Sequence, residues 1–141
     1  MNPDSPDQQQ RIAEELQSHG VIPTPQRLQI AAVLLDRPQH MSADQIMAAV
    51  NRESPRVSKA TVYNTLRLFC EKGLAREVIV DPTRVFYDST TGSHHHIYNV
   101  DTGDLTDIEA GQVAFSKLPE LPAGMHTDGV EVIVRVRKHS R

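Results

Sequence analysis

The sequence predicts an α+β protein of two units, in which a helical unit closed by a β-hairpin precedes a smaller α/β unit. Three observations predict this arrangement. Helical periodicity with capping signals recurs four times between residues 5 and 73. After Gly73 the apolar pattern changes to the alternation typical of strands. A polar stretch, residues 89–93, then separates this part from a second series of strands. The 141 residues suffice for one domain or two small ones.

Each predicted helix begins at a residue that can cap it. The four N-caps are Ser5, Thr24, Ser42 and Ser58. A proline follows the first two caps, and a glutamine three residues after the first and third completes a capping box. Gly20 ends the first helix, Pro38 stops the second and Gly73 ends the fourth.

A β-hairpin is predicted directly after these helices. Residues 74–80 and 84–88 read as strands around an Asp-Pro-Thr turn at 81–83. We expect His40, which follows Pro38, at the base of the third helix. Short helices closed by a two-stranded wing make a winged helix-turn-helix, which we assign to residues 1–88.

The second unit, residues 94–141, follows a hinge at residues 89–93. Its predicted elements are strands at 95–100, 105–108 and 130–136, a turn at 101–103 and a helix at 109–118. A unit of about 50 residues buries little core of its own. We therefore expect it to pair with a second copy, as a dimerisation domain.

Charge and cysteine content narrow the function classes. The net charge is −3, yet residues 56–76 hold five bases (Arg56, Lys59, Arg67, Lys72, Arg76) against one acid. This indicates a polyanionic partner for that segment, although a solvated helix face gives the same pattern. The single cysteine, Cys70, excludes an internal disulfide and a zinc site built from several thiolates. Without a secretory signal or a long apolar run, we expect a reducing cytoplasm and no membrane partner.

The fourth predicted helix has the side chains that a DNA-reading helix needs. Lys59, Tyr63 and Arg67 are spaced i, i+4 and i+8 and share an edge opposite the apolar stripe, with Ala60 and Asn64 beside them. Small residues allow close approach, cations reach phosphates, and the amide and hydroxyl reach base edges. The alternative is that Tyr63 covers the core and the bases are merely solvated.

The His94-His95-His96 run is the second chemical feature. In a strand, His94 and His96 share one face and His95 takes the other. The carboxylates and imidazole that could join them are Asp88, Asp107, on the paired strand, and His40. Such a set of nitrogen and oxygen ligands suits Fe(II), Mn(II) or Zn(II), and the lack of thiolates favours iron or manganese. The alternatives are a solvated histidine loop and ordinary turn carboxylates.

Together these residues resemble the Fur family of metal-responsive bacterial repressors. The resemblance runs from about residue 10 to residue 137, and its pieces are residues 24–27, 40–46, 60–66, 73–74, 86–88, 94–96 and 104–108. It implies a regulatory metal site at His40, Asp88, His94, His96 and Asp107, occupied by Fe(II) or Mn(II), or by Zn(II) in vitro. A metal there would set the angle between the two domains, and hence the spacing of the recognition helices in a homodimer.

The resemblance also implies the DNA contacts. Tyr63 and Asn64 fall on the family's base-reading positions. Many members have arginine at the second position, so the base preference expected from the family is open here. Arg27 falls on a segment that touches the DNA backbone or minor groove, and Lys59 and Arg67 complete the expected contact set. The expected partner is a double-stranded operator, an A/T-rich inverted repeat, bound by a homodimer or a tetramer.

One departure from the family pattern is large. Most members hold a structural zinc with two Cys-x-x-Cys pairs, the first of which would fall on Asn99 and Thr102, and the C-terminal pair is absent. No four-cysteine zinc is therefore expected. This departure and the histidine run are similar to the Irr branch, which we favour on sequence: such a repressor controls iron homeostasis, and haem at His94, His95 and His96 weakens its DNA binding. The alternative is a PerR-type sensor, to which Asp107 is similar, in which peroxide oxidises His40 or His94 at an Fe(II) site.

Two other classes explain less of the sequence. A metal-activated water at His94 and His96 would make a hydrolase, but the second unit leaves little room for a cleft and the basic helix would have no role. We therefore expect a regulator and not an enzyme. A metal-free DNA-binding or interaction module would keep its behaviour when both histidines are replaced by alanine. Cys70 is expected to be a small packed residue, and His126 and His139 to be exposed.

Overall fold

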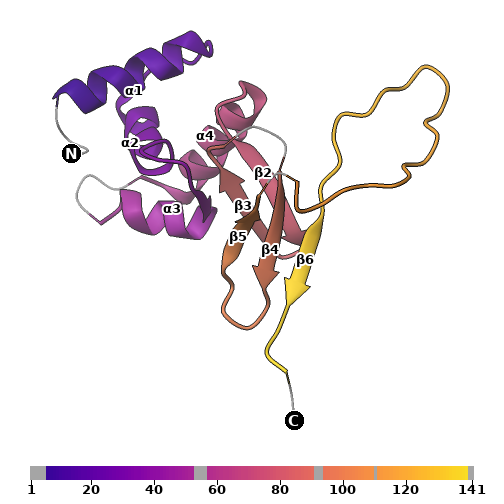
Figure 1. Cartoon of the computed structure of the whole chain (residues 1–141). Coiled ribbons are helices and arrows are strands. Elements are labelled where there is room, and N and C mark those ends of the chain that lie inside the picture. The colour runs from indigo at the N-terminus through magenta and orange to yellow at the C-terminus, as the bar shows by residue number, and fades with distance from the viewer. Residues whose placement is uncertain (1–5, 53–56, 91–93, 110, 140–141) are drawn as a thin grey trace. The chain divides into compact units, whose positions relative to one another are not determined.

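The computed structural model describes residues 6–52, 57–90, 94–109 and 111–139 of the chain (Figure 1). The chain divides into two compact units, residues 1–91 and 92–141, called here the first and second unit. The division falls within the polar stretch that the sequence suggests as a hinge, part of which, like Ser5 and Arg56, lies outside the described residues. None of the described helices combines the length and the apolar character that a membrane crossing requires.

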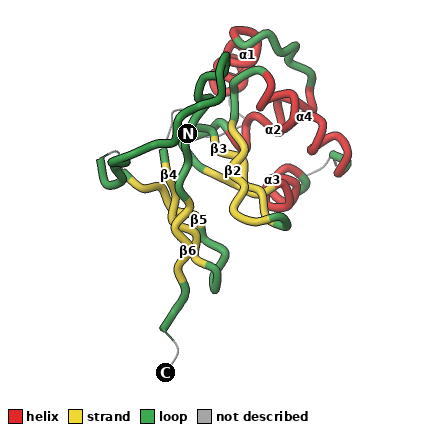
Figure 2. Tube along the Cα trace, turned by 90° about the vertical axis from the view of Figure 1, so that its right-hand side faces the viewer, coloured by secondary structure: helices red, strands yellow, loops and turns green. Residues whose placement is uncertain are grey.

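The first unit contains the helices and one small sheet (Figures 1 and 2). Its elements are α1 (Pro6–Ser18), α2 (Pro25–Leu34), β1 (His40–Ser42), α3 (Ala43–Val50), α4 (Lys59–Glu71), β2 (Arg76–Asp81) and β3 (Arg84–Asp88). The apolar faces of the helices meet in one core, where Leu16, Ile30, Ile46, Leu66 and Phe69 are fully buried. Burial of these faces stabilises helices that are too short to persist alone.

The predicted caps of the second, third and fourth helices are confirmed. Thr24 Oγ1 accepts the Arg27 N–H at 3.3 Å and Ser58 Oγ accepts the Thr61 N–H at 3.1 Å. Ser42 and Gln45 form the full capping box. Each cap satisfies a backbone donor that the first helical turn leaves without a partner.

Gln8, expected to form a capping box with Ser5, which lies outside the described residues, also contacts the segment after α2. Its side chain is buried, and its Nε2 donates to Asp36 Oδ1 at 3.0 Å, while Arg11 donates to its Oε1. The residue therefore joins α1 to the segment that follows α2.

The sheet of the first unit has a strand that the sequence did not predict. The hairpin β2–β3 is as expected, but β1 pairs antiparallel with β3 on its other side, giving the order β1-β3-β2. His40 therefore lies in a strand that leads directly into α3, so it precedes the third helix as expected, but the strand itself was not predicted. Three residues are too few to show an alternating pattern, and their pairing partners are 44–48 residues away in sequence.

The second unit is a three-stranded sheet in the order β5-β4-β6, formed by β4 (His95–Asn99), β5 (Leu105–Ile108) and β6 (Ile133–Val136). The turn between β4 and β5 is organised by Asn99, whose Oδ1 accepts the N–H groups of Asp101 and Thr102. β6 runs parallel to β4, and it begins three residues later than the predicted strand at 130–136.

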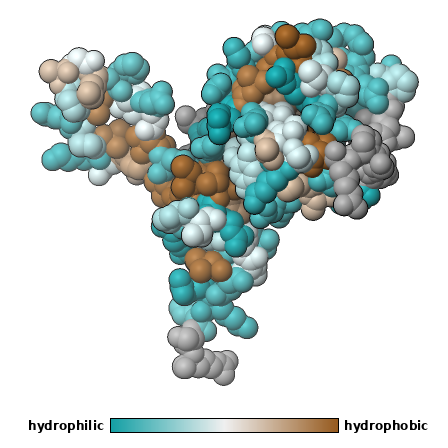
Figure 3. All heavy atoms as spheres, turned by 180° about the vertical axis from the view of Figure 1, so that it is seen from behind, coloured by the Kyte–Doolittle hydropathy of each residue, from teal (hydrophilic) through white to brown (hydrophobic). Residues whose placement is uncertain are grey.

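The helix predicted at 109–118 is wrong, since no helix forms in the described part of 109–131. Phe115, Leu118 and Leu121 in this segment are all exposed, so within the described residues they do not form a buried helical face. A ten-residue helix is marginal without such packing, and prolines at 119 and 122 prevent its extension. Apolar side chains also reach the surface elsewhere, as the brown groups among teal in Figure 3 show.

Candidate functional site

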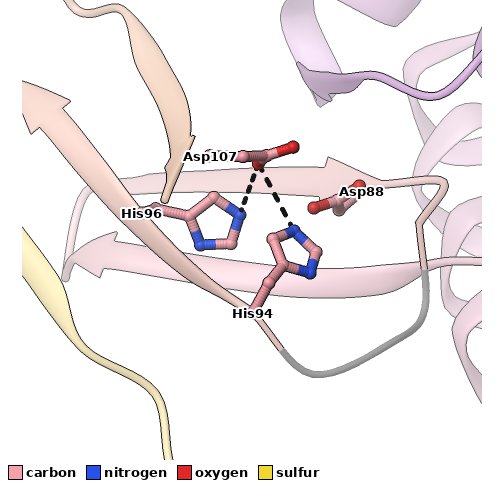
Figure 4. Close-up of side chains that lie close together, drawn as sticks. All are labelled: Asp88, His94, His96 and Asp107. Atoms are coloured by element: carbon pink, nitrogen blue, oxygen red, sulfur yellow. Dashed lines mark ion pairs between the residues drawn. The ribbon is translucent and has the colours of Figure 1, made fainter. Parts of the chain in front are cut away.

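Two histidines and an aspartate converge on the sheet of the second unit. His94 directly precedes β4, His96 lies within it, and Asp107 stands opposite His96 on β5. Asp107 Oδ1 lies 3.3 Å from His94 Nε2 and 3.2 Å from His96 Nε2, and Figure 4 shows both rings turned toward this carboxylate. The alternation of a strand places both imidazoles on one face, as the sequence predicts. We call these three residues the β4–β5 triad.

The geometry of the triad fits a divalent first-row metal ion. One ligand atom from each residue lies within 4.8 Å of the others. Ligands that each lie about 2.1 Å from an ion, at tetrahedral or octahedral angles, are themselves about 3.0–3.5 Å apart. The observed 3.2 and 3.3 Å agree with this spacing. The side chain of His96 is completely buried, whereas that of Asp107 is 52% exposed, which leaves an approach for an ion.

A carboxylate that the sequence reasoning missed approaches His96 from its other side. Glu131 Oε1 lies 3.3 Å from His96 Nδ1. The only sequence signal for it is its place just before the alternating residues of β6. The contact itself depends on the parallel pairing of β4 with β6, which brings together residues 35 apart in sequence.

His95 points away from the triad, as the strand alternation predicts. Its Nδ1 accepts the Val132 N–H at 2.8 Å, and its ring lies edge-on to Phe115 with centroids 5.7 Å apart. One ring nitrogen of His95 is thus used to hold the backbone next to β6. The three histidines do not present a common surface.

The other two predicted metal ligands lie opposite each other in the first unit. His40 of β1 is the register partner of Asp88 of β3. The ladder extends one pair further, because Ser89 N–H donates to Gln39 O at 2.9 Å and Gln39 N–H donates to Ser89 Oγ at 3.0 Å. Asp88 is buried, its Oδ1 accepts the Thr90 N–H, and the His40 ring meets Phe86 edge-on.

The predicted DNA-contacting residues on α4 share its exposed side. Val62, Thr65, Leu66 and Phe69 form the buried side of the helix. The exposed residues of α4 are Lys59, Ala60, Tyr63, Asn64, Arg67 and, at its C-terminal end, Glu71. Lys59 Nζ lies 5.9 Å from the centre of the Tyr63 ring, so the cation and the aromatic face stand together. Tyr63 is 40% exposed, and it does not cover the core in the way that the alternative interpretation requires.

A groove beside Tyr63 and the side chain of Arg27 are the other features of the first unit that bear on DNA contact. A groove of about 500 Å³ runs between the start of α3, Tyr63 and the β2–β3 turn, and its lining carries Asp44 and Glu77 as well as Arg84. Because carboxylates repel phosphates, the basic residues of α4 are better placed than this groove to contact a DNA backbone. Arg27, also predicted to touch DNA, is half-buried and its Nη1 donates to Ile22 O.

The remaining reactive side chains stand apart from these groups. Cys70 is half-buried in α4, and burial, followed by the nearby Glu77 and Glu71, raises the pKa of its thiol from 9.0 to about 11. A thiol that stays protonated is a poor nucleophile and a poor metal ligand, in agreement with a packing role. His126 and His139 are exposed, as predicted.

A winged helical unit followed by a small sheet with a cluster of nitrogen and oxygen ligands defines a class of regulators that couple metal binding to DNA binding. The chain belongs to the Ferric uptake regulator family, whose model matches residues 18–132. The family resemblance and the α+β fold class expected from the sequence are thereby confirmed.

Individual members of the family are similar to this chain in sequence or in fold. The peroxide-responsive repressor PerR of Staphylococcus aureus is 34% identical over 98 residues, which cover 70% of this chain and 66% of the relative, just under two thirds of its length. A manganese-containing structure of the ferric uptake regulator of Pseudomonas aeruginosa is 25% identical, with a TM-score of 0.65 over 90% of this chain and 97% of the other. The iron-containing regulator from Francisella tularensis shares the fold, with a TM-score of 0.67 and 20% identity over 84% and 92%.

Proposed function

We propose that this protein is a DNA-binding transcriptional repressor whose affinity for its operator depends on a metal ion held by the β4–β5 triad. The observation that carries the proposal is the convergence of His94 Nε2 and His96 Nε2 on one oxygen of Asp107, at 3.3 and 3.2 Å. A winged helix-turn-helix alone would not need two imidazoles and a carboxylate aimed at one point. The role in regulation rather than catalysis follows the family to which the chain belongs.

In this proposal His40 and Asp88 complete the metal site. The pair contributes one imidazole and one carboxylate, like the triad, and the two strands that carry it fix both side chains at one register position. Fe(II) or Mn(II) suits the resulting set of three nitrogens and two carboxylates better than Zn(II), which prefers four ligands. Because the ligands come from both units, an ion that binds all five would favour one arrangement of the units over others.

The DNA contact is proposed for the exposed side of α4. Tyr63 and Asn64 are placed to meet base edges, while Lys59, Arg67 and Arg27 meet phosphates. An A/T-rich inverted repeat would be read by two copies of the chain, each placing its α4 in one major groove.

Dimerisation is proposed for the second unit. Phe115, Leu118, Leu121, Val134 and Val136 are between 38% and 51% exposed there, which is unusual for so many apolar side chains in a unit of this size. A second copy would remove this surface from water, and no structural zinc is needed.

Among the signals, peroxide is the better supported. The Staphylococcus aureus relative is a peroxide-responsive repressor. The triad also contains Asp107, the residue in which the sequence is similar to a PerR-type sensor. Fe(II) in this site would supply the reduction of peroxide that leaves His40 or His94 oxidised. The haem response favoured by the sequence remains the alternative, but His95 Nδ1 is already used by the Val132 N–H, which weakens the case for three cooperating histidines.

The proposal is tested by measuring operator affinity without oxygen for the metal-free, Mn(II), Fe(II) and haem-treated protein. We expect Mn(II) and Fe(II) to raise affinity, and hydrogen peroxide to abolish binding by the Fe(II) form only. The variant that replaces His94 and His96 with alanine should lose the metal response. A matched variant that replaces the exposed His126 and His139 should keep it. Metal-independent binding by the wild type would refute the proposal, and loss of binding with haem alone would favour the haem-responsive alternative.

The DNA-reading role of α4 has its own test. Tyr63→Ala should weaken operator binding by about 1–3 kcal/mol if the side chain reads a base, and leave binding to random DNA nearly unchanged. Lys59→Ala should instead weaken both and lower the dependence of affinity on salt. An unchanged preference for the operator in Tyr63→Ala would show that another residue reads the sequence.

A further inference from the structure

We propose that Glu131 is a positioning residue that orients His96 for metal binding through the ring nitrogen that faces away from the ion. This inference rests on the proposed metal site and adds to it a residue outside the predicted ligand set. His96 has a carboxylate at each end of its imidazole: Asp107 Oδ1 is 3.2 Å from Nε2 and Glu131 Oε1 is 3.3 Å from Nδ1. The His96 side chain is completely buried between them.

The two carboxylates have different tasks because of where they lie. Asp107 shares its oxygen between His94 Nε2 and His96 Nε2, so the metal-binding side of His96 is its Nε2 side. Glu131 lies at the opposite ring edge. A carboxylate there cannot bind an ion held on Nε2, but it can accept the proton that Nδ1 carries when Nε2 presents its lone pair. The arrangement is that of a carboxylate–histidine–metal triad.

The backbone around Glu131 is fixed to the strand that carries His96. His96 N–H donates to Val132 O at 3.1 Å, and Val132 N–H donates to His95 Nδ1 at 2.8 Å. Ile133 is then the register partner of His96 in the parallel pairing. Contacts on both polar groups of Val132 thus hold the residue that follows Glu131. This assigns a structural use to His95: it anchors the backbone from which Glu131 reaches His96.

The consequence is that His96 becomes a stronger and better oriented metal ligand. A carboxylate that accepts the Nδ1–H proton favours the tautomer in which Nε2 is unprotonated, and it raises the basicity of Nε2 toward a metal ion. Loss of such a partner lowers metal affinity by about 10–100-fold in comparable sites. Glu131 is 32% exposed, so its replacement leaves no cavity in a core and should not unfold the unit.

The first test is metal affinity, measured by competition with a fluorescent chelator for Mn(II) and Co(II). Glu131→Ala removes the acceptor and should weaken binding about 10–100-fold, whereas Glu131→Gln keeps an oxygen without its charge and should lose less. Asp128→Asn is the matched control, because it removes an exposed carboxylate three residues away and should bind as the wild type does. Equal affinity in Glu131→Ala and the wild type would overturn the inference.

The second test reads the Nδ1–H proton of His96 by NMR in the protein loaded with Zn(II), which is diamagnetic. A hydrogen bond to Glu131 should move this proton's resonance far downfield in the wild type, and Glu131→Ala should return it upfield. A purely structural role of Glu131 would leave the resonance unchanged. A wild-type protein that binds neither Mn(II) nor Co(II), or a His94→Ala variant that binds both normally, would overturn the proposed function together with this inference. If His94→Ala loses metal binding while Glu131→Ala binds metal as tightly as the wild type, the role of Glu131 alone is overturned.

Discussion

Asn51, a half-buried residue, connects the end of α3 to the start of α4, and its replacement should destabilise the first unit strongly. Its Oδ1 accepts the Val57 N–H at 2.6 Å and its Nδ2 donates to Val57 O at 3.0 Å. Val57 is 3% exposed and directly precedes Ser58, the N-cap of α4. One side chain therefore satisfies both backbone groups of a buried residue at the entrance to the proposed recognition helix.

The size of the effect follows from those two hydrogen bonds. Leaving a buried donor or acceptor without a partner costs about 1–3 kcal/mol each, so Asn51→Ala, which leaves two such groups, should lower the free energy of unfolding by about 2–6 kcal/mol. Asn51→Asp keeps the acceptor for the Val57 N–H but opposes two oxygens at the second bond, and it should cost about 1–2 kcal/mol. Since whole domains are stable by about 5–15 kcal/mol, either loss is easily measured.

Urea unfolding followed by far-ultraviolet circular dichroism is the assay, because the described helices all lie in the first unit. Asn64→Ala is the matched control: it makes the same chemical change at an exposed position on α4, where it should be neutral or stabilise by up to about 0.6 kcal/mol through helix propensity. A loss in Asn51→Ala below about 1 kcal/mol, or no larger than in the control, would refute the reasoning from buried backbone groups.

Three further predictions concern the first unit. Ser42→Ala removes the α3 N-cap and should cost about 0.5–2 kcal/mol by the same urea assay, and a neutral result would mean that the capping box contributes nothing. Cys70, with its thiol pKa raised to about 11, should react with iodoacetamide near neutral pH about 100-fold more slowly than the urea-unfolded chain; equal rates would contradict its packed environment. Burial, together with Glu77, raises the pKa of Tyr87 from 10.0 to about 12, so its protonated form stabilises the fold fully below pH 10 and loses that effect as the pH rises to 12. In Tyr87→Phe the urea midpoint of unfolding should therefore decrease less between pH 9.5 and 11.5 than in the wild type. An equal decrease in both proteins would show that Tyr87 does not cause the loss of stability at high pH.

The elements that the sequence predicted well are those whose signals are local. The caps at Thr24, Ser42 and Ser58 are read from single residues and their neighbours, since the bonds they make span only three positions. The hairpin β2–β3 was equally accessible, because its turn lies between its strands. The triad was predicted for the same reason: strand alternation places His94 and His96 together, and a short turn brings Asp107 opposite.

The elements that were missed depend on contacts between distant residues. β1 has no pattern of its own and exists because β3, about 46 residues later, offers a free edge. The helix expected at 109–118 has suitable spacing, but Phe115 and Leu118 stay exposed in the part of the chain that the structure describes. Periodicity reports how a segment could bury its apolar side chains, while packing decides whether it does.

By itself, the sequence determined the helices of the first unit, the caps of α2, α3 and α4, the wing, the exposed basic side of α4 and the residue types of the candidate metal site, because each follows from residues a few positions apart. Tertiary structure alone decided that His40 stands opposite Asp88, that His95 holds the backbone of Val132, and that Glu131 meets the buried nitrogen of His96. These three contacts depend on strand pairings across 35 or more residues, and the free energy of such pairings comes from the whole sheet rather than from any local pattern.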